Sequence, residues 1–283
     1  MKIILLNIFL LIFLSSCVKT IQDDFDDFND KIVVNSILKA NEVALVQVCN
    51  SLSVNENNVN FIDNAIIRLY KNGLYLEDLD LVAEGKYISK NIVEKGNKYK
   101  IEVEIPTYKT LISEVEVPFE SELINFEIIK KGFVEYSGVT YPIVKLKFKN
   151  PTDTIAYYQV VLYDVDKQEG IIRVIDLEKL SGPVIQNEGV KIAVFSNEII
   201  KTNEYEIELI YSDVFCLNCL LELRRISFSY YKYLQSFALY SQNKNQTANI
   251  INSPAFNLFS NIQNGLGIFG AYNGIFSDTI PLR

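Results

Sequence analysis

The sequence contains no histidine and no tryptophan. Histidine is the side chain that most often serves as a general base near neutral pH and as a metal ligand. Its absence argues against Ser-His-Asp or Cys-His nucleophilic catalysis and against a typical zinc site. We therefore expect neither a catalytic centre of these kinds nor a cofactor or bound metal, and we expect a protein that is not an enzyme.

Runs of basic residues are also missing, and the formal net charge is −8. A nucleic-acid partner would require a basic face that neutralises phosphates. The charge therefore argues against nucleic-acid binding.

No apolar segment is long enough to span a membrane as a helix, and the longest one lies at the N-terminus. Ile3–Leu14 follows Lys2 and is almost continuously apolar, but it is too short to cross a bilayer. Ser15 and Ser16 then precede Cys17. This arrangement predicts a lipoprotein signal peptide over residues 1–16. The Cys17 thiol would receive a diacylglycerol and become the new N-terminus, so we predict that Cys17 is lipidated. The alternative is an ordinary buried cysteine.

The segment after Cys17 is strongly acidic, with five aspartates between Asp23 and Asp30. Like charges at this density repel one another and resist packing, so residues 17–30 are predicted to be a solvated, lipidated tether. It is either a plain spacer or an export signal, because acidic residues close behind a lipidated cysteine resemble the surface-export signal of Bacteroidota lipoproteins. The second interpretation places the protein at the outer membrane, facing the cell exterior.

Three further cysteines are present. Cys216 and Cys219 form a C-x-x-C pair, for which we predict a local disulfide or two thiols in an exported protein. A single C-x-x-C is a weak metal signal and lacks the βαβ surroundings of thioredoxin-like enzymes. Cys49 follows the apolar run Val43–Val48 and is predicted to be a core residue.

Residues 31–118 consist of short strand-like segments. In Lys98–Ile105 apolar residues alternate with charged ones, as in a strand with one buried face. Asn72-Gly73 between two apolar runs is typical of a type I′ hairpin. Together the segments predict an immunoglobulin-like β-sandwich that ends at Pro118. The expected strands are Ile32–Leu38, Val43–Cys49, Ala65–Tyr70, Leu74–Leu79, Lys86–Ser89, Lys98–Ile105 and Thr110–Val117.

Residues 119–283 are predicted to form a second β-rich domain. Val144–Phe148 again alternates apolar residues with lysines, and Pro151 ends that strand. The pattern predicts a second β-sandwich or a partly closed barrel, so the fold class is mostly β. Further strands are expected at Thr154–Val165, Ile171–Leu177, Val190–Phe195, Glu204–Tyr211 and Leu220–Ile226.

The periodicity changes at Ser227, which begins a predicted C-terminal amphipathic helix over residues 227–242. One helical face carries an aromatic stripe, for which Ser227 or Ser229 could supply the cap. Such a stripe usually packs on a sheet and less often binds a ligand. The glycines that follow predict a kinked final strand rather than a phosphate loop, because no strand–loop–helix context surrounds them. The stripe consists of Tyr230, Tyr233, Leu234, Phe237 and Tyr240.

Several segments, taken in order, resemble one group of Bacteroidota lipoproteins, the domain-of-unknown-function family four-two-four-nine. The resemblance covers nearly the whole mature chain. It is carried by the lipobox and acidic tether, Ile32–Leu38, Asn64–Tyr70 with Asn72-Gly73, Gly85–Tyr87, Gly96–Tyr99, Tyr230–Leu234, Ser260–Ile262 and Asn264–Phe269.

The resemblance implies an outer-membrane lipoprotein whose gene often lies beside that of a TonB-dependent receptor, and it carries over no catalytic residue. We therefore expect a non-enzymatic, surface-exposed binding or accessory subunit of a TonB-dependent transporter or related complex. Two alternatives remain, an envelope glycan hydrolase with paired carboxylates and a structural or adhesive module. Asp153-Thr154-Ile155 and Asp278-Thr279-Ile280 match the short pattern on which Bacteroidota attach O-glycans, so Thr154 and Thr279 are predicted glycosylation sites.

Overall fold

Alternating apolar and polar residues form strands through most of the chain in the computed structural model. The residues that the structure describes are 30–52, 58–134, 136–166, 171–175, 177–181, 193–198, 200–211, 218–246, 257–277 and 280–281. The predictions for the signal peptide and for Cys17, Cys216 and Thr279 lie outside these residues.

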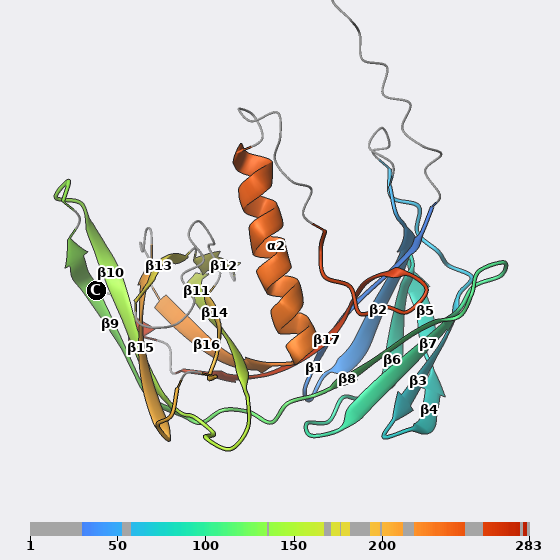
Figure 1. The fold of residues 1–283 in the computed structure, drawn as a ribbon, viewed down its shortest axis with the longest axis horizontal. Coiled ribbons are helices and arrows are strands. Elements are labelled where there is room, and N and C mark those ends of the chain that lie inside the picture. Colours follow the sequence, from blue (N-terminus) through green and yellow to red (C-terminus); the bar gives the residue numbers. More distant parts are fainter. Residues whose placement is uncertain are drawn as a thin grey trace, which may run out of the picture. The chain divides into compact units, whose positions relative to one another are not determined.

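The strands form three sheets (Figure 1). The largest has ten strands and contains the order β12-β11-β16-β17-β1-β2-β6-β5, with β14 beside β11 and β18 beside β16. The two smaller sheets have four strands each, in the orders β4-β3-β7-β8 and β13-β15-β10-β9. The strands are β1 Ile32–Lys39, β2 Val43–Asn50, β3 Ile66–Lys71, β4 Leu74–Asp78, β5 Asp80–Ala83, β6 Lys86–Ile92, β7 Lys98–Glu104, β8 Leu111–Glu116, β9 Leu123–Val134, β10 Thr140–Lys149, β11 Tyr157–Asp166, β12 Ile171–Ile175, β13 Leu177–Ser181, β14 Ala193–Ser196, β15 Glu204–Tyr211, β16 Asn218–Ile226, β17 Leu266–Phe276 and β18 Ile280–Pro281.

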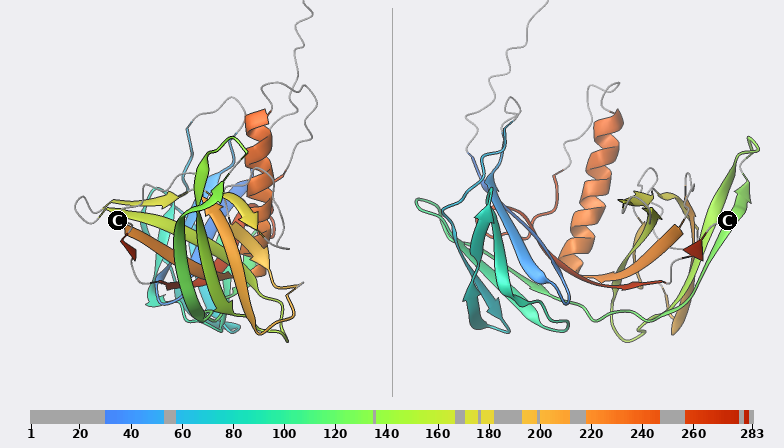
Figure 2. Two further views of the ribbon diagram at one scale, coloured as in Figure 1. Left: turned by 90° about the vertical axis from the view of Figure 1, so that its left-hand side faces the viewer. Right: turned by 180° about the vertical axis from the view of Figure 1, so that it is seen from behind.

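β17 joins the two halves of the large sheet. It runs parallel to β1, with Val33 opposite Leu266 at one end and Lys39 opposite Tyr272 at the other. On its other side it runs antiparallel to β16 (Figure 2). The sequence predicts this glycine-rich strand as part of the second domain. The strand itself is confirmed, and it completes the sheet of the N-terminal region as well.

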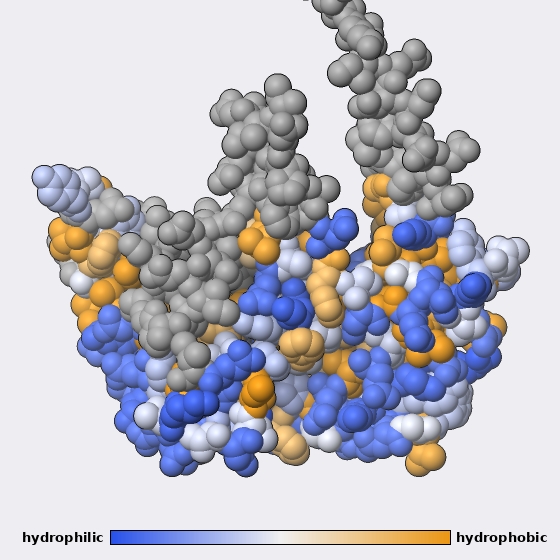
Figure 3. Space-filling view, in the orientation of Figure 1, coloured by the Kyte–Doolittle hydropathy of each residue, from blue (hydrophilic) through white to orange (hydrophobic). Residues whose placement is uncertain are grey.

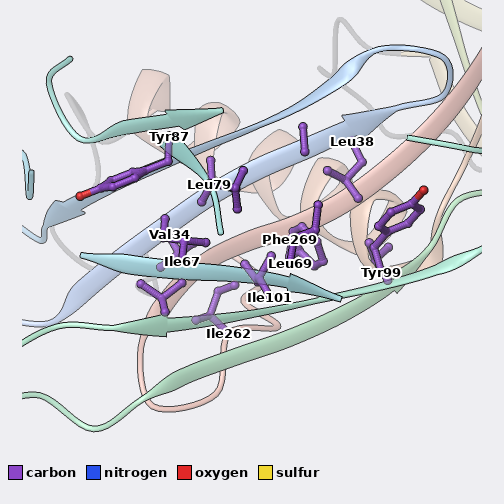
Figure 4. Close-up of a cluster of buried hydrophobic side chains, with 14 of the residues drawn as sticks. Val34, Leu38, Ile67, Leu69, Leu79, Tyr87, Tyr99, Ile101, Ile262 and Phe269 are labelled. Carbon is purple, nitrogen blue, oxygen red and sulfur yellow. The ribbon is translucent and has the colours of Figure 1, made fainter. Parts of the chain in front are cut away.

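Both small sheets pack on the same face of the large sheet. Phe269 and Ala271 of β17 belong to the core beneath the β4-β3-β7-β8 sheet, whereas Ile275 packs against the core beneath β13-β15-β10-β9. These three residues alternate along one strand, so their side chains point to one face. Figure 4 shows the first core, in which Ile262 and Phe269 from the C-terminal region meet side chains of β1, β3 and β7.

The segment before β17 is held in place by the Asn261 side chain, which hydrogen-bonds the backbone N–H and C=O of Phe269 as a neighbouring strand would. The Asn261 amide nitrogen donates to the Phe269 carbonyl at 2.8 Å, and the Phe269 N–H donates to the Asn261 side-chain oxygen at 2.9 Å. The Ser113 hydroxyl of β8 donates to the Asn261 carbonyl at 2.9 Å. Asn261 thereby connects β17 to β8 of the β4-β3-β7-β8 sheet.

The predicted helix is confirmed as α2, Phe228–Gln246. Ser227 caps it, because its hydroxyl accepts from the Tyr230 N–H at 3.3 Å and from the Ala271 N–H at 3.0 Å. α2 lies on the other face of the large sheet, where a Cβ on Gly270 would be 2.9 Å from the Cβ of Tyr230 (Figure 2). Within the described ranges, no helix is long and apolar enough to cross a membrane.

The prediction of a mostly β fold with one C-terminal helix is confirmed. The described strands form no closed barrel, so the sandwich alternative agrees with the structure. Asn72 and Gly73 adopt φ values of 51° and 81° and connect β3 to β4, as predicted. The prediction for Cys49 was wrong, because Ala44, Val46 and Val48 face the core and Cys49 is only half-buried on the opposite face.

Candidate functional site

A groove with a volume of about 470 Å³ lies between α2 and the sheet face formed by β1, β2 and β17. We call this space the groove. Figure 3 shows apolar residues among hydrophilic ones in this part of the surface. The groove is lined by Asn35, Ser36, Ile37, Leu45, Gln47, Tyr230, Tyr233, Leu234, Phe237 and Ile268.

The helical wall of the groove is the predicted aromatic stripe. The rings of Tyr233 and Phe237 stack with their centroids 6.2 Å apart and an interplanar angle of 19°. Leu234 is buried, whereas 39% of Phe237 remains exposed. Tyr240, the last residue of the stripe, does not line the groove. The stripe therefore packs on the sheet at one edge and leaves aromatic surface open at the other.

The floor of the groove is the outer face of the large sheet. Asn35 of β1 lies directly opposite Gln47 of β2, and Ile268 of β17 lies beside Asn35. Among the described residues, the structure shows no hydrogen bond to either side-chain amide. Apart from Ser36, which is buried, the remaining floor residues are apolar, and 48% of Leu45 is exposed. None of the lining residues carries a carboxylate, an ammonium or a guanidinium group.

A buried polar cluster lies on the same sheet face, on β11 and β16. The Arg224 guanidinium donates to Glu222 Oε2 through Nε at 2.8 Å and through Nη2 at 2.6 Å. It also donates to the Tyr163 hydroxyl at 2.6 Å and to Gln159 at 3.1 Å, and Tyr163 donates to Glu222 Oε2 at 2.7 Å. Glu222 is 1% exposed, and its Oε1 has no hydrogen-bond partner among the described residues.

This cluster is connected to the groove by two tyrosine rings. The Arg224 guanidinium carbon lies 4.5 Å from the centroid of the Tyr272 ring. The Tyr272 ring is in turn 6.4 Å from that of Tyr230, which lines the groove. Burial raises the pKa of both tyrosines, so their hydroxyls stay neutral at physiological pH. The pKa of Arg224 is lowered by burial but raised more by its contacts, chiefly Glu222, and the net shift is upward.

A second hollow of about 480 Å³ lies near the start of α2. Exposed Phe119, Ile155 and Phe228 contribute apolar surface to it. Its two carboxylates, Glu114 and Glu116, come from the same strand, β8. They therefore lie side by side and do not face each other across the hollow, as the two carboxylates of a glycoside hydrolase do across the scissile bond.

The other predicted site residues do not converge on the groove. Cys219 is buried in β16 and is disulfide-bonded, but Cys216 lies outside the described residues, so their pairing stays a prediction. Thr154 is exposed in a bend before β11. Within the described ranges, no group of three or more acidic or cysteine side chains could hold a metal ion.

Sequence reasoning found the helical wall of the groove but missed its floor. Asn35 and Gln47 interrupt otherwise apolar strands, and this was the available signal, but pairing of their strands in register was needed to bring them together. Glu222 and Arg224 were also missed, because two charged residues at alternate positions of a strand usually indicate a solvated face.

The sequence matches a known family over most of its length. Residues 18–274 match the family model described as Domain of unknown function (DUF4249). No curated protein matches the chain.

Proposed function

The chain belongs to the family of the domain of unknown function DUF4249, and we propose that it is a lipid-anchored protein at the outer surface of a Bacteroidota outer membrane. We propose further that it is a binding subunit and not an enzyme. Its partner would be a TonB-dependent transporter or a related outer-membrane complex. The protein would hold a ligand for this partner in the groove beside α2.

The groove is the observation that carries this proposal. Binding sites for small ligands are concave, mostly apolar and built with a few placed polar groups. The groove has this composition, with aromatic side chains on the helix and two amides on the floor. Its lining offers no group that could act as a general acid or base near neutral pH, which favours binding over catalysis.

Two features of the sequence support a location at the cell surface. The lipobox ending in Cys17 supplies an anchor, and the acidic residues that follow it supply a solvated connection to the first strand. The exposed position of Thr154 is compatible with an attached glycan, which would require access to a modifying enzyme.

Copurification tests the partnership. The chain, carrying an affinity tag at its C-terminus, would be isolated from native outer membranes in mild detergent. We expect a TonB-dependent receptor to elute with it in stoichiometric amount. A chain that elutes alone in every mild detergent, or a purified chain that hydrolyses envelope glycans, would contradict the proposal.

A further inference from the structure

We propose that the groove binds a short, neutral peptide with apolar side chains, and that Asn35 and Gln47 hydrogen-bond the backbone of this peptide. The inference rests on the proposed function as a binding subunit and specifies its ligand. It follows from the size of the groove, the nature of its walls and the two amides on its floor.

The size of the groove fits a ligand of a few residues. Its volume of about 470 Å³ falls in the range of roughly 300–1,000 Å³ that is typical of small-molecule sites. A helix on one side and a sheet on the other leave a space that an extended chain can enter.

The walls select apolar, uncharged side chains. Leu45 on the floor and Phe237 on the helix are exposed and offer only hydrocarbon surface. An ionised side chain placed among them would lose its hydration without gaining a partner of opposite charge. The ligand should therefore bury neutral, apolar groups against the aromatic stripe.

The two amides match a peptide group. Each primary amide has donors and an acceptor, and a peptide unit has one N–H and one C=O. Asn35 and Gln47 are directly opposite each other on neighbouring strands, so their side chains leave the sheet about 5 Å apart. They can thus bind one backbone segment from the same side, and among the described residues neither is engaged elsewhere.

Two other neutral ligands fit the groove less well. A fatty acyl chain would remove water from both amides without replacing the lost hydrogen bonds. A sugar would bring many hydroxyl groups against the side chains of Ile37 and Leu45, which cannot hydrogen-bond them. An apolar peptide can bury its side chains against the apolar lining and hydrogen-bond both amides through its backbone.

Affinity selection with mass spectrometry tests the inference. The full chain, reconstituted in lipid nanodiscs so that no free detergent competes, is mixed with acetylated and amidated tetrapeptides. One pool contains only Ala, Val, Leu, Ile and Phe residues, and a second contains only Gly, Ser, Asn and Gln residues. We expect retention of apolar peptides at least about tenfold above polar ones, a difference within reach of one or two well-buried anchors. Maltotetraose and methyl octanoate, which are both neutral, serve as the sugar and acyl probes.

Variants locate the binding. Gln47→Met keeps the shape of the side chain but removes the amide, and it should weaken peptide retention about tenfold. Phe237→Ser should abolish retention. Leu239→Ser is the matched control, since 42% of Leu239 is exposed on the same helix and two residues rotate it about 200° away from Phe237. Leu45→Ser changes an exposed floor residue of β2, so a loss of binding in this variant cannot be attributed to a disturbed helix.

Each outcome decides the inference. Retention of apolar peptides that Leu239→Ser preserves and that Gln47→Met, Phe237→Ser and Leu45→Ser reduce supports it. Equal retention of both pools, retention that none of the three groove variants changes, or stronger binding of maltotetraose or methyl octanoate overturns it. If the receptor still copurifies in any of these cases, only the ligand assignment fails and the proposed function stands.

Discussion

Gly267 of β17 lies directly against Val34 of β1. A Cβ at position 267 would be 2.1 Å from the Val34 carbonyl oxygen, and the Gly267 backbone has a φ of +111°. Both the contact and the φ value exclude other residues. The parallel pairing of β1 with β17 therefore depends on this glycine.

Gly267→Ala should destabilise the fold by about 3 kcal/mol, because it combines backbone strain with a clash that only a shift of β17 relieves. Gly73→Ala is the control. Gly73 also has a positive φ, but no atom lies within 4 Å of the added methyl group, so this change should cost about 1 kcal/mol. The free energy of unfolding in urea measures both. Equal losses would show that β17 does not approach β1 this closely.

Asn261→Ala should cost about 2 kcal/mol, since it removes both hydrogen bonds between this side chain and the Phe269 backbone. Asn261→Asp retains an acceptor for the Phe269 N–H, and the Ser229 hydroxyl still donates to the Phe269 carbonyl. The aspartate variant should therefore be less destabilised. The midpoint of urea unfolding distinguishes the two, and an alanine variant as stable as the parent would refute the bracing role of Asn261.

Arg224→Met should destabilise the protein by about 3 kcal/mol, because it leaves the Glu222 carboxylate buried without its partner. Adding Glu222→Gln to this variant should restore part of the loss, since the buried charge is then gone. A double-mutant cycle in urea gives the coupling between the two positions. If the two losses are simply additive, the ion pair does not exist as described.

Glu120 connects the end of the first sandwich to β17. Its carboxylate accepts from the Lys95 ammonium at 2.5 and 2.7 Å and from the Asn273 amide at 2.9 Å. The hydrogen bond from Lys95 is the main reason that its pKa lies below the usual 4.5. A carboxyl group whose pKa is lowered by folding stabilises the native state above its unfolded pKa, and this contribution is lost as the pH falls through the lower, folded value.

The Glu120→Gln variant should thus be less stable than the parent near neutral pH, and the difference should shrink as the pH is lowered to about 3. Urea unfolding across this pH range measures it. Glu84→Gln is the control, because Glu84 is exposed and its one ion pair within the described residues, to Lys86, is 4.0 Å long. A difference between Glu120→Gln and the parent that stays constant with pH would contradict the role of the ionised carboxylate.

The strands of the N-terminal region were largely predictable from the sequence. Tyr99, Ile101 and Val103 face the core and the intervening residues do not, as their alternation indicated. β5 was missed because its four residues are all exposed and show no alternation. β9 was missed as well, since Leu123–Val134 carries no strict period of two.

The pairing of strands that lie far apart in the sequence could not be predicted from the alternation of apolar and polar residues. Ile268 lies beside Asn35 because β17 returns to β1 after more than two hundred residues, and a strand's own sequence does not specify its neighbour. The groove depends on this pairing, so the aromatic stripe of α2 could be identified from Tyr230 and Phe237 but its opposite wall could not. Glu222 and Arg224 are buried for a similar reason, because Tyr163 of β11 and Tyr272 of β17, which neighbour β16, pack around them.

The proposed location at the outer surface depends on the lipid on Cys17, and Cys17→Ser removes the thiol that would carry this lipid. Cells would be grown with radiolabelled palmitate and their membranes separated by density. We predict that the parent chain carries the label, is processed to a shorter form and sediments with the outer membrane, whereas Cys17→Ser carries no label and keeps the length of its precursor. An unlabelled parent chain, or a Cys17→Ser variant that is processed and located like the parent, would contradict the lipid anchor and the surface location proposed from it.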